Sequence, residues 1–222
     1  MSTEDGPGLR STVFMKGCSL SCSWCQNPES INPWPQLDWF DSSCIGCGTC
    51  IQTCPNGELS FAGDKLMATH ELCTTCALCT EVCPSGALKL LGTQRGSEEL
   101  ARELEKDKAY YRTSEGGVTF SGGEPCLQPE FVAETLRSLK QSRIHTALDT
   151  SGMCSKDSLQ MALFATDLVL FDLKIADPSI HQKYTRASNK KILENFRYLC
   201  STVGQNTGPK EIHVRTPIIP RA

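Results

Sequence analysis

Long hydrophobic runs are missing from this chain of 222 residues. No stretch approaches the roughly 18 consecutive apolar residues of a transmembrane helix, so none is predicted. A strong excess of one charge is also missing: the formal net charge is −3, which gives no electrostatic reason to expect nucleic acid or an acidic membrane as a partner. The start of the chain, MSTEDGPGLR, is polar and lacks the apolar stretch of a secretory signal. We therefore expect a cytoplasmic protein.

Cysteine, by contrast, is abundant, with 14 residues. In a secreted chain such a number would suggest disulfide bonds. Most of these cysteines stand in tight groups with gaps of two or three residues, and such gaps suit thiolates that converge on one metal centre. We favour metal ligation over a disulfide framework. Three cysteines outside the groups are interpreted as small packing residues: Cys126, Cys154 and Cys200.

Eight of the cysteines form an internal repeat. The segment CIGCGTCIQTCP, which begins at Cys44, recurs 29 residues later as CTTCALCTEVCP, which begins at Cys73. The repeat predicts a duplicated unit over residues 41–92. This unit has few long apolar runs, so bound metal is expected to supply much of its folding free energy.

The rest of the chain alternates strand and helix patterns. β-Branched and apolar residues predict strands at 12–15, 118–120, 146–149, 168–173 and 211–216. Caps, first-turn proline and apolar spacing predict a helix capped by Ser97, one with Pro129 in its first turn, one from Ser155 to about Phe164, and one around residues 192–199. Alternating strands and helices form parallel sheets, so we predict an α/β fold, open or barrel-like, interrupted after its first strand by the cysteine-rich unit.

The spacing within the repeat, C-x2-C-x2-C-x3-C-P, is the pattern of bacterial two-cluster ferredoxins. In that pattern three cysteines bind one cluster and the fourth binds the other. Two zinc sites are the alternative, but zinc modules usually pair two C-x2-C knuckles or add histidine, and this unit has only His70. The resemblance implies two [4Fe–4S] centres that pass single electrons, one held by Cys44, Cys47, Cys50 and Cys83 and the other by Cys73, Cys76, Cys79 and Cys54.

Another cysteine group, GCSLSCSWCQNP at residues 17–28, offers only three ligands: Cys18, Cys22 and Cys25. It follows the first predicted strand and so lies on a loop at that strand's C-terminal end. Three thiolates can hold three irons of a cluster and leave the fourth iron open to a small molecule with an amine and a carboxylate. An open position distinguishes a reactive metal site from a closed one. The alternatives are chance spacing or a fourth ligand from elsewhere.

Polar residues also follow the later predicted strands. The C-terminal ends of parallel strands meet at one rim, where barrel enzymes have their active sites. A purely structural interpretation gives no reason for this placement. The residues are Gly122, Gly123 and Glu124 after the second strand, Asp149 and Thr150 after the third, Asp172 and Lys174 after the fourth, and Arg215 near the end of the fifth.

The spacing C-x3-C-x2-C, with Trp24 directly before the last cysteine, resembles the radical S-adenosylmethionine superfamily. The segment TFSGGEP resembles that superfamily's GGE motif, in which glycines let the backbone approach the methionine end of the cosubstrate. The resemblance implies a partial (β/α) barrel of the radical S-adenosylmethionine type. Its expected bounds are residues 1–40 and 93–222, with a ferredoxin-like insert at 41–92.

Further segments, in order along nearly the whole chain, closely resemble the activating enzymes of glycyl radical enzymes. They are DGPGLRSTVFMKGCSLSCSWCQNPES, GGVTFSGGEPCLQPEF, LDTSG, LVLFDLK, HQKYTRASN and RTPIIP. The two-cluster insert resembles the subgroup that activates enzymes such as glycerol dehydratase, choline lyase, hydroxyphenylacetate decarboxylase or arylalkane synthases. The pyruvate formate-lyase activating enzyme lacks the insert, which argues against that partner.

This resemblance implies an oxidoreductase with three [4Fe–4S] clusters and S-adenosylmethionine as cosubstrate. A reduced flavodoxin or ferredoxin would supply an electron, and the clusters of the insert offer a route for it to the three-cysteine cluster. Cleavage of the cosubstrate at the three-cysteine cluster would give a 5′-deoxyadenosyl radical, which would take a hydrogen atom from a glycine of the partner enzyme. Oxygen would quench such a radical, so anaerobic work is expected.

The resemblance also implies roles for single residues. Asp172 and Lys174 match a DLK motif that contacts the cosubstrate, and the Lys174 ammonium could meet the methionine carboxylate. Asp149 matches a position that, with Asp172, helps to hold a monovalent cation near that carboxylate. Trp24 and Gln26 are expected to touch the adenosine.

Structural alternatives stand beside each of these roles. They are an exposed ion pair for Asp172 and Lys174, helix capping for Asp149, packing for Trp24 and Gln26, a strand-to-helix turn for the GGE motif and a surface salt bridge for Arg215. His145 and His181 are interpreted as strand-edge and surface residues without a ligand role.

Two departures from the family pattern bear on activity. Relatives usually carry a short strand before DGPG, and they continue after the IIP segment with more strand and helix, including a histidine that helps to bind the cosubstrate. By that comparison this chain, which stops at Ala222, is expected to form a barrel without its last strand or strands and with an open sheet edge. Two other functions therefore compete: an electron-transfer module with an inactive truncated barrel, and a metal-storage or zinc-binding protein.

Overall fold

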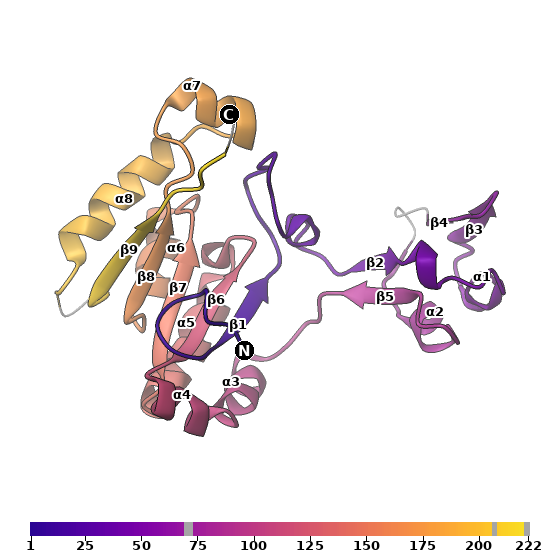
Figure 1. Cartoon of the computed structure of the whole chain (residues 1–222), viewed down its shortest axis with the longest axis horizontal. Coiled ribbons are helices and arrows are strands. Elements are labelled where there is room, and N and C mark those ends of the chain that lie inside the picture. The colour runs from indigo at the N-terminus through magenta and orange to yellow at the C-terminus, as the bar shows by residue number, and fades with distance from the viewer. Residues whose placement is uncertain (69–72, 206–207, 220–222) are drawn as a thin grey trace. The chain divides into compact units, whose positions relative to one another are not determined.

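The computed structural model describes residues 1–68, 73–205 and 208–219. His70, Pro220 and Ala222, which the sequence interpretation used, lie outside these ranges. The chain divides into two compact units (Figure 1). The first, here called the sheet unit, comprises Met1–Pro33 and Arg95–Ala222, and the second, the insert unit, comprises Trp34–Gln94.

Strands and helices alternate in the sheet unit as expected. Its strands are β1 (Arg10–Met15), β6 (Gly117–Gly122), β7 (His145–Thr150), β8 (Leu168–Asp172) and β9 (Glu211–Arg215). Its α-helices are α3 (Ser97–Glu105), α4 (Lys108–Ser114), α5 (Pro129–Gln141), α6 (Lys156–Leu163), α7 (Pro178–Thr185) and α8 (Lys190–Thr202), and short 3-10 turns lie at Pro28–Ser30 and Pro125–Leu127.

The five strands form one parallel sheet in the order β1-β6-β7-β8-β9. The register places Met15 beside Gly122, Thr150 beside Phe171 and Asp172 beside Arg215. All C-terminal strand ends therefore lie on one rim of the sheet. The predicted α/β fold with a parallel sheet is confirmed, and β1 and β9 are the edges of the sheet in the described part of the chain.

The main core lies between the sheet and its helices (Figure 1). Alternation along β8 shows how the sheet divides its side chains, because successive residues of a strand point to opposite faces. Val169 and Phe171 belong to the large core that includes Leu136 of α5 and Leu199 of α8, whereas Leu170 belongs to a small cluster on the other face. The helices thus cover one face of the sheet, and a small apolar cluster of Ala147, Leu168 and Leu170 lies on the other.

Local signals explain some of the helix boundaries. Pro129 is the first residue of α5, as predicted, and the Ser155 hydroxyl accepts a hydrogen bond from the Ser158 amide, as expected of a cap. The predicted Ser97 cap is wrong, because Gly96 occupies the cap position and Ser97 is the first helical residue. The Ser97 hydroxyl instead donates to Glu134 on α5 at 2.8 Å, so a contact between helices replaces the local cap.

The sequence interpretation holds for one of the two histidines. His145, expected at the edge of a strand, is the first residue of β7, and its ring lies 3.3 Å from the Arg10 guanidinium. His181, expected at the surface, is only 1% exposed. Its Nδ1 lies 2.7 Å from the Ala187 carbonyl oxygen, which fastens the turn after α7. The surface interpretation of His181 is wrong, because its burial depends on contacts with the following segment that residue type alone does not reveal.

The three unassigned cysteines do not behave alike. Cys126 and Cys154 are buried packing residues, as predicted. Cys200 is exposed, so its interpretation as a packing residue is wrong.

The described residues of the insert unit form two antiparallel strand pairs and two short helices. Strand β2 (Gln36–Trp39) pairs with β5 (Leu88–Leu91), and β3 (Leu59–Ala62) pairs with β4 (Lys65–Ala68). The helices are α1 (Thr49–Thr53) and α2 (Leu78–Glu81), and a 3-10 turn lies at Asp41–Ser43. A small core includes Cys50, Leu59, Leu66 and Leu88. So few apolar residues make a weak core for a unit of this size, which fits stabilisation by bound metal.

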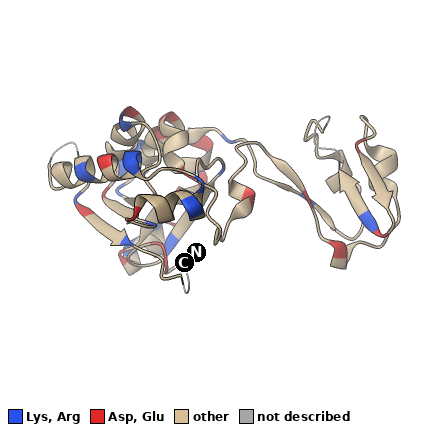
Figure 2. Cartoon of the chain, turned by 90° about the horizontal axis from the view of Figure 1, so that it is seen from above, with Lys and Arg blue, Asp and Glu red and all other residues tan. Residues whose placement is uncertain are grey.

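Charged side chains of both signs are spread over the helices of the sheet unit (Figure 2). This distribution fits the small net charge of −3. Among the described residues, no helix is long and apolar enough to cross a membrane.

Candidate active site

The three-cysteine loop follows β1 and is fastened at several points. The Cys18 amide donates to the Ile31 carbonyl at 3.0 Å. The Ser21 amide donates to Thr185 at 2.9 Å, and the Ser23 amide to Tyr184 at 2.9 Å, both at the end of α7. The loop is therefore held by backbone groups on both sides of its cysteines.

The glycines of the GGE segment allow β6 to approach this loop closely. Gly122 has a φ of +99°, and a Cβ there would lie 2.5 Å from the Met15 nitrogen. A Cβ on Gly123 would lie 2.2 Å from the Gly17 oxygen. The Gly123 amide donates to the Met15 carbonyl at 2.8 Å. Any side chain at these positions would push the loop away from the sheet.

Glu124 is fully buried and connects two loops of the rim. Its carboxylate accepts hydrogen bonds from the Thr150 hydroxyl at 2.6 Å, the Ser151 hydroxyl at 2.7 Å and the Ser151 amide at 3.0 Å. Its backbone amide donates to Gly17 at 2.7 Å. The Glu124 side chain thus supports the loops of the rim from inside the protein. Its place at the methionine end of the cosubstrate, which the GGE resemblance implies, stays a prediction.

A cavity of about 690 Å³ opens on this rim of the sheet unit. Most of the residues predicted for the site line it, although they come from strands far apart in the sequence. They are Cys18, Cys22, Trp24, Cys25, Gln26, Gly122, Gly123, Asp149, Asp172 and Lys174. Glu124 is not among the lining residues, and Arg215 is.

Four charged side chains form one network along the cavity wall. Arg215 donates to Asp149 at 2.5 Å and to Asp172 at 3.0 Å. Lys174 donates to the other oxygen of Asp172 at 2.6 Å. The Ser121 hydroxyl donates to Asp149 at 2.7 Å. Two carboxylates are therefore matched by two cations, which suits a wall that faces a charged ligand.

The pKa values in this network follow from burial and neighbours. Burial, together with the nearby Asp172, raises the pKa of Asp149 despite the opposing effect of Arg215. Burial alone would lower the pKa of Lys174, but Asp172 outweighs it and the net direction is upward. Lys174 is therefore held as an ammonium group beside the cavity.

The cysteine thiols of the loop fit an iron–sulfur cluster by type and position. Burial raises the pKa of Cys18 to about 11 and also raises that of Cys22, so iron binding has to displace these protons. In the described ranges, no three cysteine, histidine or acidic side chains converge on a single ion. The ligands of an iron–sulfur cluster need not meet at one point, because each cysteine binds a different iron.

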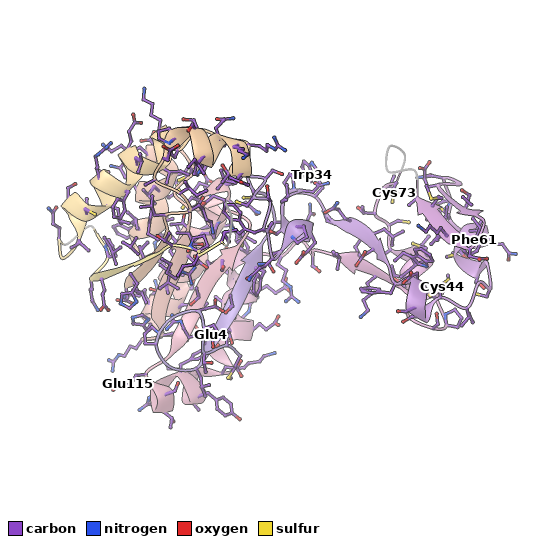
Figure 3. All side chains as sticks on the ribbon, turned by 45° about the horizontal axis from the view of Figure 1, so that its top comes forward. Glu4, Trp34, Cys44, Phe61, Cys73 and Glu115 are labelled. Atoms are coloured by element: carbon purple, nitrogen blue, oxygen red, sulfur yellow. The ribbon has the colours of Figure 1, made fainter. Side chains whose placement is uncertain are left out.

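The insert unit contains two separate cavities lined by cysteines. One is lined by Cys44, Cys47, Cys50 and Cys83, and the other by Cys54, Cys73, Cys76 and Cys79. Each set is the one that the ferredoxin pattern assigns to a single cluster. Figure 3 labels Cys44 and Cys73, the first cysteine of each repeat.

Hydrogen bonds lower the pKa of the last cysteine of each repeat. Burial alone raises the pKa of Cys54, but backbone N–H groups, among them those of Asn56 and Glu58, outweigh it and lower the pKa. The pKa of Cys83 is lowered in the same way, by hydrogen bonds from the Ser85 hydroxyl and from the backbone N–H groups that follow. Both thiols are thus biased toward the thiolate that binds iron.

Sequence reasoning missed or undervalued several residues of the site. Ser121 and Tyr184 stand in the segments TFSGGEP and HQKYTRASN, where neither has an expected role of its own. The Ser121 hydroxyl nevertheless donates to Asp149, and the ring of Tyr184 lies 6.1 Å from that of Trp24. Arg215 was weighed against a surface salt bridge, but it binds two cavity carboxylates. Its place at the end of the fifth predicted strand and its place at the start of the segment RTPIIP are the signals that indicate such a role.

Comparison with protein families gives two matches. The 4Fe-4S dicluster domain matches residues 40–90. The Radical SAM superfamily matches residues 72–208, more than half of the chain.

Curated relatives align with almost the whole chain. One is the (2S)-3-sulfopropanediol dehydratase activating enzyme of Klebsiella oxytoca, 44% identical over 98% of this chain and 68% of the relative. Another is the trans-4-hydroxy-L-proline dehydratase activating enzyme of Clostridioides difficile, 40% identical over 98% of this chain and 70% of the relative. A solved domain of the pyruvate-formate lyase-activating enzyme from Bacteroides vulgatus ATCC 8482 is 36% identical over 47% of this chain and 61% of that chain, with a TM-score of 0.41.

Proposed function

The chain belongs to the radical SAM superfamily and, within it, to the activating enzymes of glycyl radical enzymes, and from this membership we propose how its residues divide the reaction. The observation that carries the proposal is the cavity on the rim of the parallel sheet. It brings three half-buried cysteines of one loop together with Asp149, Asp172 and Lys174 from two other strand ends.

Cys18, Cys22 and Cys25 would hold a [4Fe–4S] cluster with one iron free of protein ligands. When bound, this cluster supplies the electron that splits S-adenosylmethionine into methionine and a 5′-deoxyadenosyl radical. The work of the chain is to hold the cosubstrate in place. The hydrogen bonds that the Ser21 and Ser23 amides donate to the Thr185 and Tyr184 carbonyls keep the three cysteines at the cavity wall.

The charged network would bind the methionine end of the cosubstrate. The Lys174 ammonium lies at the cavity and can pair with the methionine carboxylate. The carbonyl groups of Gly122 and Gly123 can accept from the ammonium group. A monovalent cation at Asp149 and Asp172, expected from the resemblance, would share these carboxylates with Arg215, which already donates to both.

Trp24 and Gln26 would contact the adenosine at the other end of the cavity. Both line it, and the ring of Trp24 lies against Tyr184 of α7. A ring braced in this way offers a flat apolar surface to a base. These contacts would place the 5′ carbon toward the open side of the cavity.

The protein substrate is proposed to be a glycyl radical enzyme, as the names of the relatives suggest for this class. The 5′-deoxyadenosyl radical takes one hydrogen atom from a glycine Cα of that partner. The products are 5′-deoxyadenosine and a glycyl radical, so one electron and one S-adenosylmethionine are consumed for each activation.

The insert unit is proposed to hold two further [4Fe–4S] clusters, which makes three in the chain. Support comes from its two cysteine-lined cavities and from the dicluster domain match. A reduced flavodoxin or ferredoxin would be the electron donor.

Iron and acid-labile sulfide analysis of anaerobically reconstituted protein tests this division. About twelve irons per chain are expected for three four-iron clusters. About eight, with none lost on substitution of Cys22, would reduce the chain to an electron-transfer module, and zinc in place of iron would refute both.

A further inference from the structure

The two cavities of the insert unit are related by the sequence repeat. A shift of 29 residues carries Leu37 and Leu59, which line one cavity, onto Leu66 and Leu88, which line the other. The same shift carries Asn56 onto Ser85, again from one lining to the other. The two cluster environments are therefore built from equivalent positions, and any difference between them is readily identified.

Two of the differences between the linings concern polar side chains with buried atoms, Trp39 and Glu58. Trp39 lines the cavity of Cys44, and its counterpart one repeat later is Ala68. Glu58 lines the cavity of Cys73, and its counterpart is Ala87 in the lining of the first cavity. Each cavity thus has one polar side chain where the other repeat has alanine.

Both polar groups are buried, and neither has a hydrogen-bond partner in the described part of the chain. Among the described residues, nothing accepts a hydrogen bond from Trp39 Nε1, and nothing donates to Glu58 Oε2. Glu58 is 4% exposed and Ala87 is 1% exposed. A buried polar group without a partner is costly, and each one in a native protein calls for an explanation, such as a redox role or a bound water or ion.

The indole N–H of Trp39 is a donor only. The sulfur atoms of a bound cluster are acceptors that would enter its cavity, and hydrogen bonds to cluster sulfur favour the reduced, more negative state. Trp39 should therefore raise the reduction potential of the cluster held by Cys44, Cys47, Cys50 and Cys83.

An ionised carboxylate has the opposite effect, because it offers only acceptors and a negative charge. Nothing donates to Glu58 Oε2 within the described ranges to offset that charge. Beside the cluster held by Cys54, Cys73, Cys76 and Cys79, it would disfavour an added electron and lower the reduction potential.

We propose that Trp39 and Glu58 separate the reduction potentials of the two insert clusters, so that a single electron resides on the cluster beside Trp39. Both residues act through the cluster environment and touch no reacting atom. The inference rests on the proposed presence of two clusters in this unit.

The test is a redox titration of the full chain, followed by electron paramagnetic resonance, in a Cys22→Ala background that removes the loop cluster. Two reduction steps are expected. Trp39→Phe keeps an aromatic ring but removes the N–H, and should make the higher-potential step about tenfold less favourable, a shift of about 59 mV for one electron. Glu58→Gln keeps the shape but removes the charge, and should make the lower-potential step more favourable by a similar factor.

Trp34→Phe is the matched control, because Trp34 belongs to the same unit, is 68% exposed and lines neither of these two cavities. It should move neither step. Both test variants should narrow the gap between the steps, each through a different step. If Trp39→Phe and Glu58→Gln bound about eight irons per chain but left both potentials unchanged, the inference would be overturned. The same holds if both substitutions shifted the same step. In either case the proposed clusters would still stand. Failure to bind these eight irons would overturn the proposed clusters as well.

Discussion

Glu124 and Ser151 are joined by two hydrogen bonds, one from the Ser151 amide at 3.0 Å and one from its hydroxyl at 2.7 Å. Glu124 follows β6 and Ser151 follows β7, so this pair fixes the relative position of two neighbouring loops at the rim. The backbone amide of Glu124 also donates a hydrogen bond to the carbonyl of Gly17, the residue before the first cysteine of the cluster loop. One buried residue thus connects three parts of the site.

Replacing Glu124 should destabilise the sheet unit. Glu124→Ala leaves the Ser151 amide and two hydroxyls without their buried acceptor, which should cost about 3 kcal/mol of unfolding free energy. Chemical denaturation followed by circular dichroism measures this loss. Glu130→Ala on the exposed side of α5 is the control and should change stability by less than about 0.5 kcal/mol. Equal effects of the two substitutions would remove the supporting role of Glu124.

Asp172 should matter for cosubstrate binding and not for cluster loading. Asp172→Asn removes the charge that holds both Lys174 and Arg215. We expect about a tenfold rise in the concentration of S-adenosylmethionine needed for half-maximal turnover, since roughly 1.4 kcal/mol corresponds to a factor of ten. Iron content should stay unchanged. The exposed Asp64 supplies the control, Asp64→Asn, which should leave both quantities as they are. If Asp172→Asn needed no more S-adenosylmethionine than the wild type for half-maximal turnover, the proposed role of Asp172 in cosubstrate binding would be contradicted.

Asp167 should make stability depend on pH in the acid range. Burial alone would raise its pKa, but hydrogen bonds from Lys140 and Lys210 and from the Thr146 amide hold the pKa well below its usual range. A lowered folded-state pKa stabilises the protein above the unfolded value of about 3.9, and this contribution is lost as pH falls toward the folded value.

Asp167→Asn should therefore lower unfolding free energy by about 2 kcal/mol at neutral pH. The difference from the wild type should shrink below about pH 4. Denaturation at a series of pH values measures this difference in unfolding free energy. Asp157→Asn, at an exposed position, is the control. A difference that stayed constant down to acid pH would refute the assignment of this dependence to Asp167.

Cys22 and Cys200 should respond oppositely to substitution. Cys22→Ala should remove about four irons per chain and abolish cleavage of S-adenosylmethionine, because Cys22 is a proposed ligand of the reactive cluster. Cys200→Ala should retain both iron and turnover, since that cysteine is exposed on α8 and lies outside the cavity lining. Iron analysis of both variants is the measurement. Loss of iron in Cys200→Ala alone would require a different ligand set.

Short-range patterns in the sequence predicted what depends on spacing. The five parallel strands, the position of Pro129 and the Ser155 cap follow from local residue preferences, and strand ends are enough to place Asp149, Asp172 and Lys174 on one rim. The cysteine repeat likewise sorts into two cavities as the spacing indicates.

Contacts between distant segments could not be predicted in this way. The burial of His181 and the bond of Ser97 to Glu134 depend on how α7 and α5 pack. The inward turn of Glu124 depends on the loop after β7, and the bridge from Arg215 to two carboxylates depends on the register of β8 and β9. Residue type shows that these groups are polar, but only the fold decides their partners.

The formation of 5′-deoxyadenosine tests the proposed activity most directly. Anaerobically reconstituted protein with about twelve irons, reduced with dithionite, should convert S-adenosylmethionine to 5′-deoxyadenosine and methionine in equal amounts, and Cys22→Ala should not. Fully loaded protein that formed no more 5′-deoxyadenosine than Cys22→Ala would contradict the assignment of a reactive cluster to Cys18, Cys22 and Cys25.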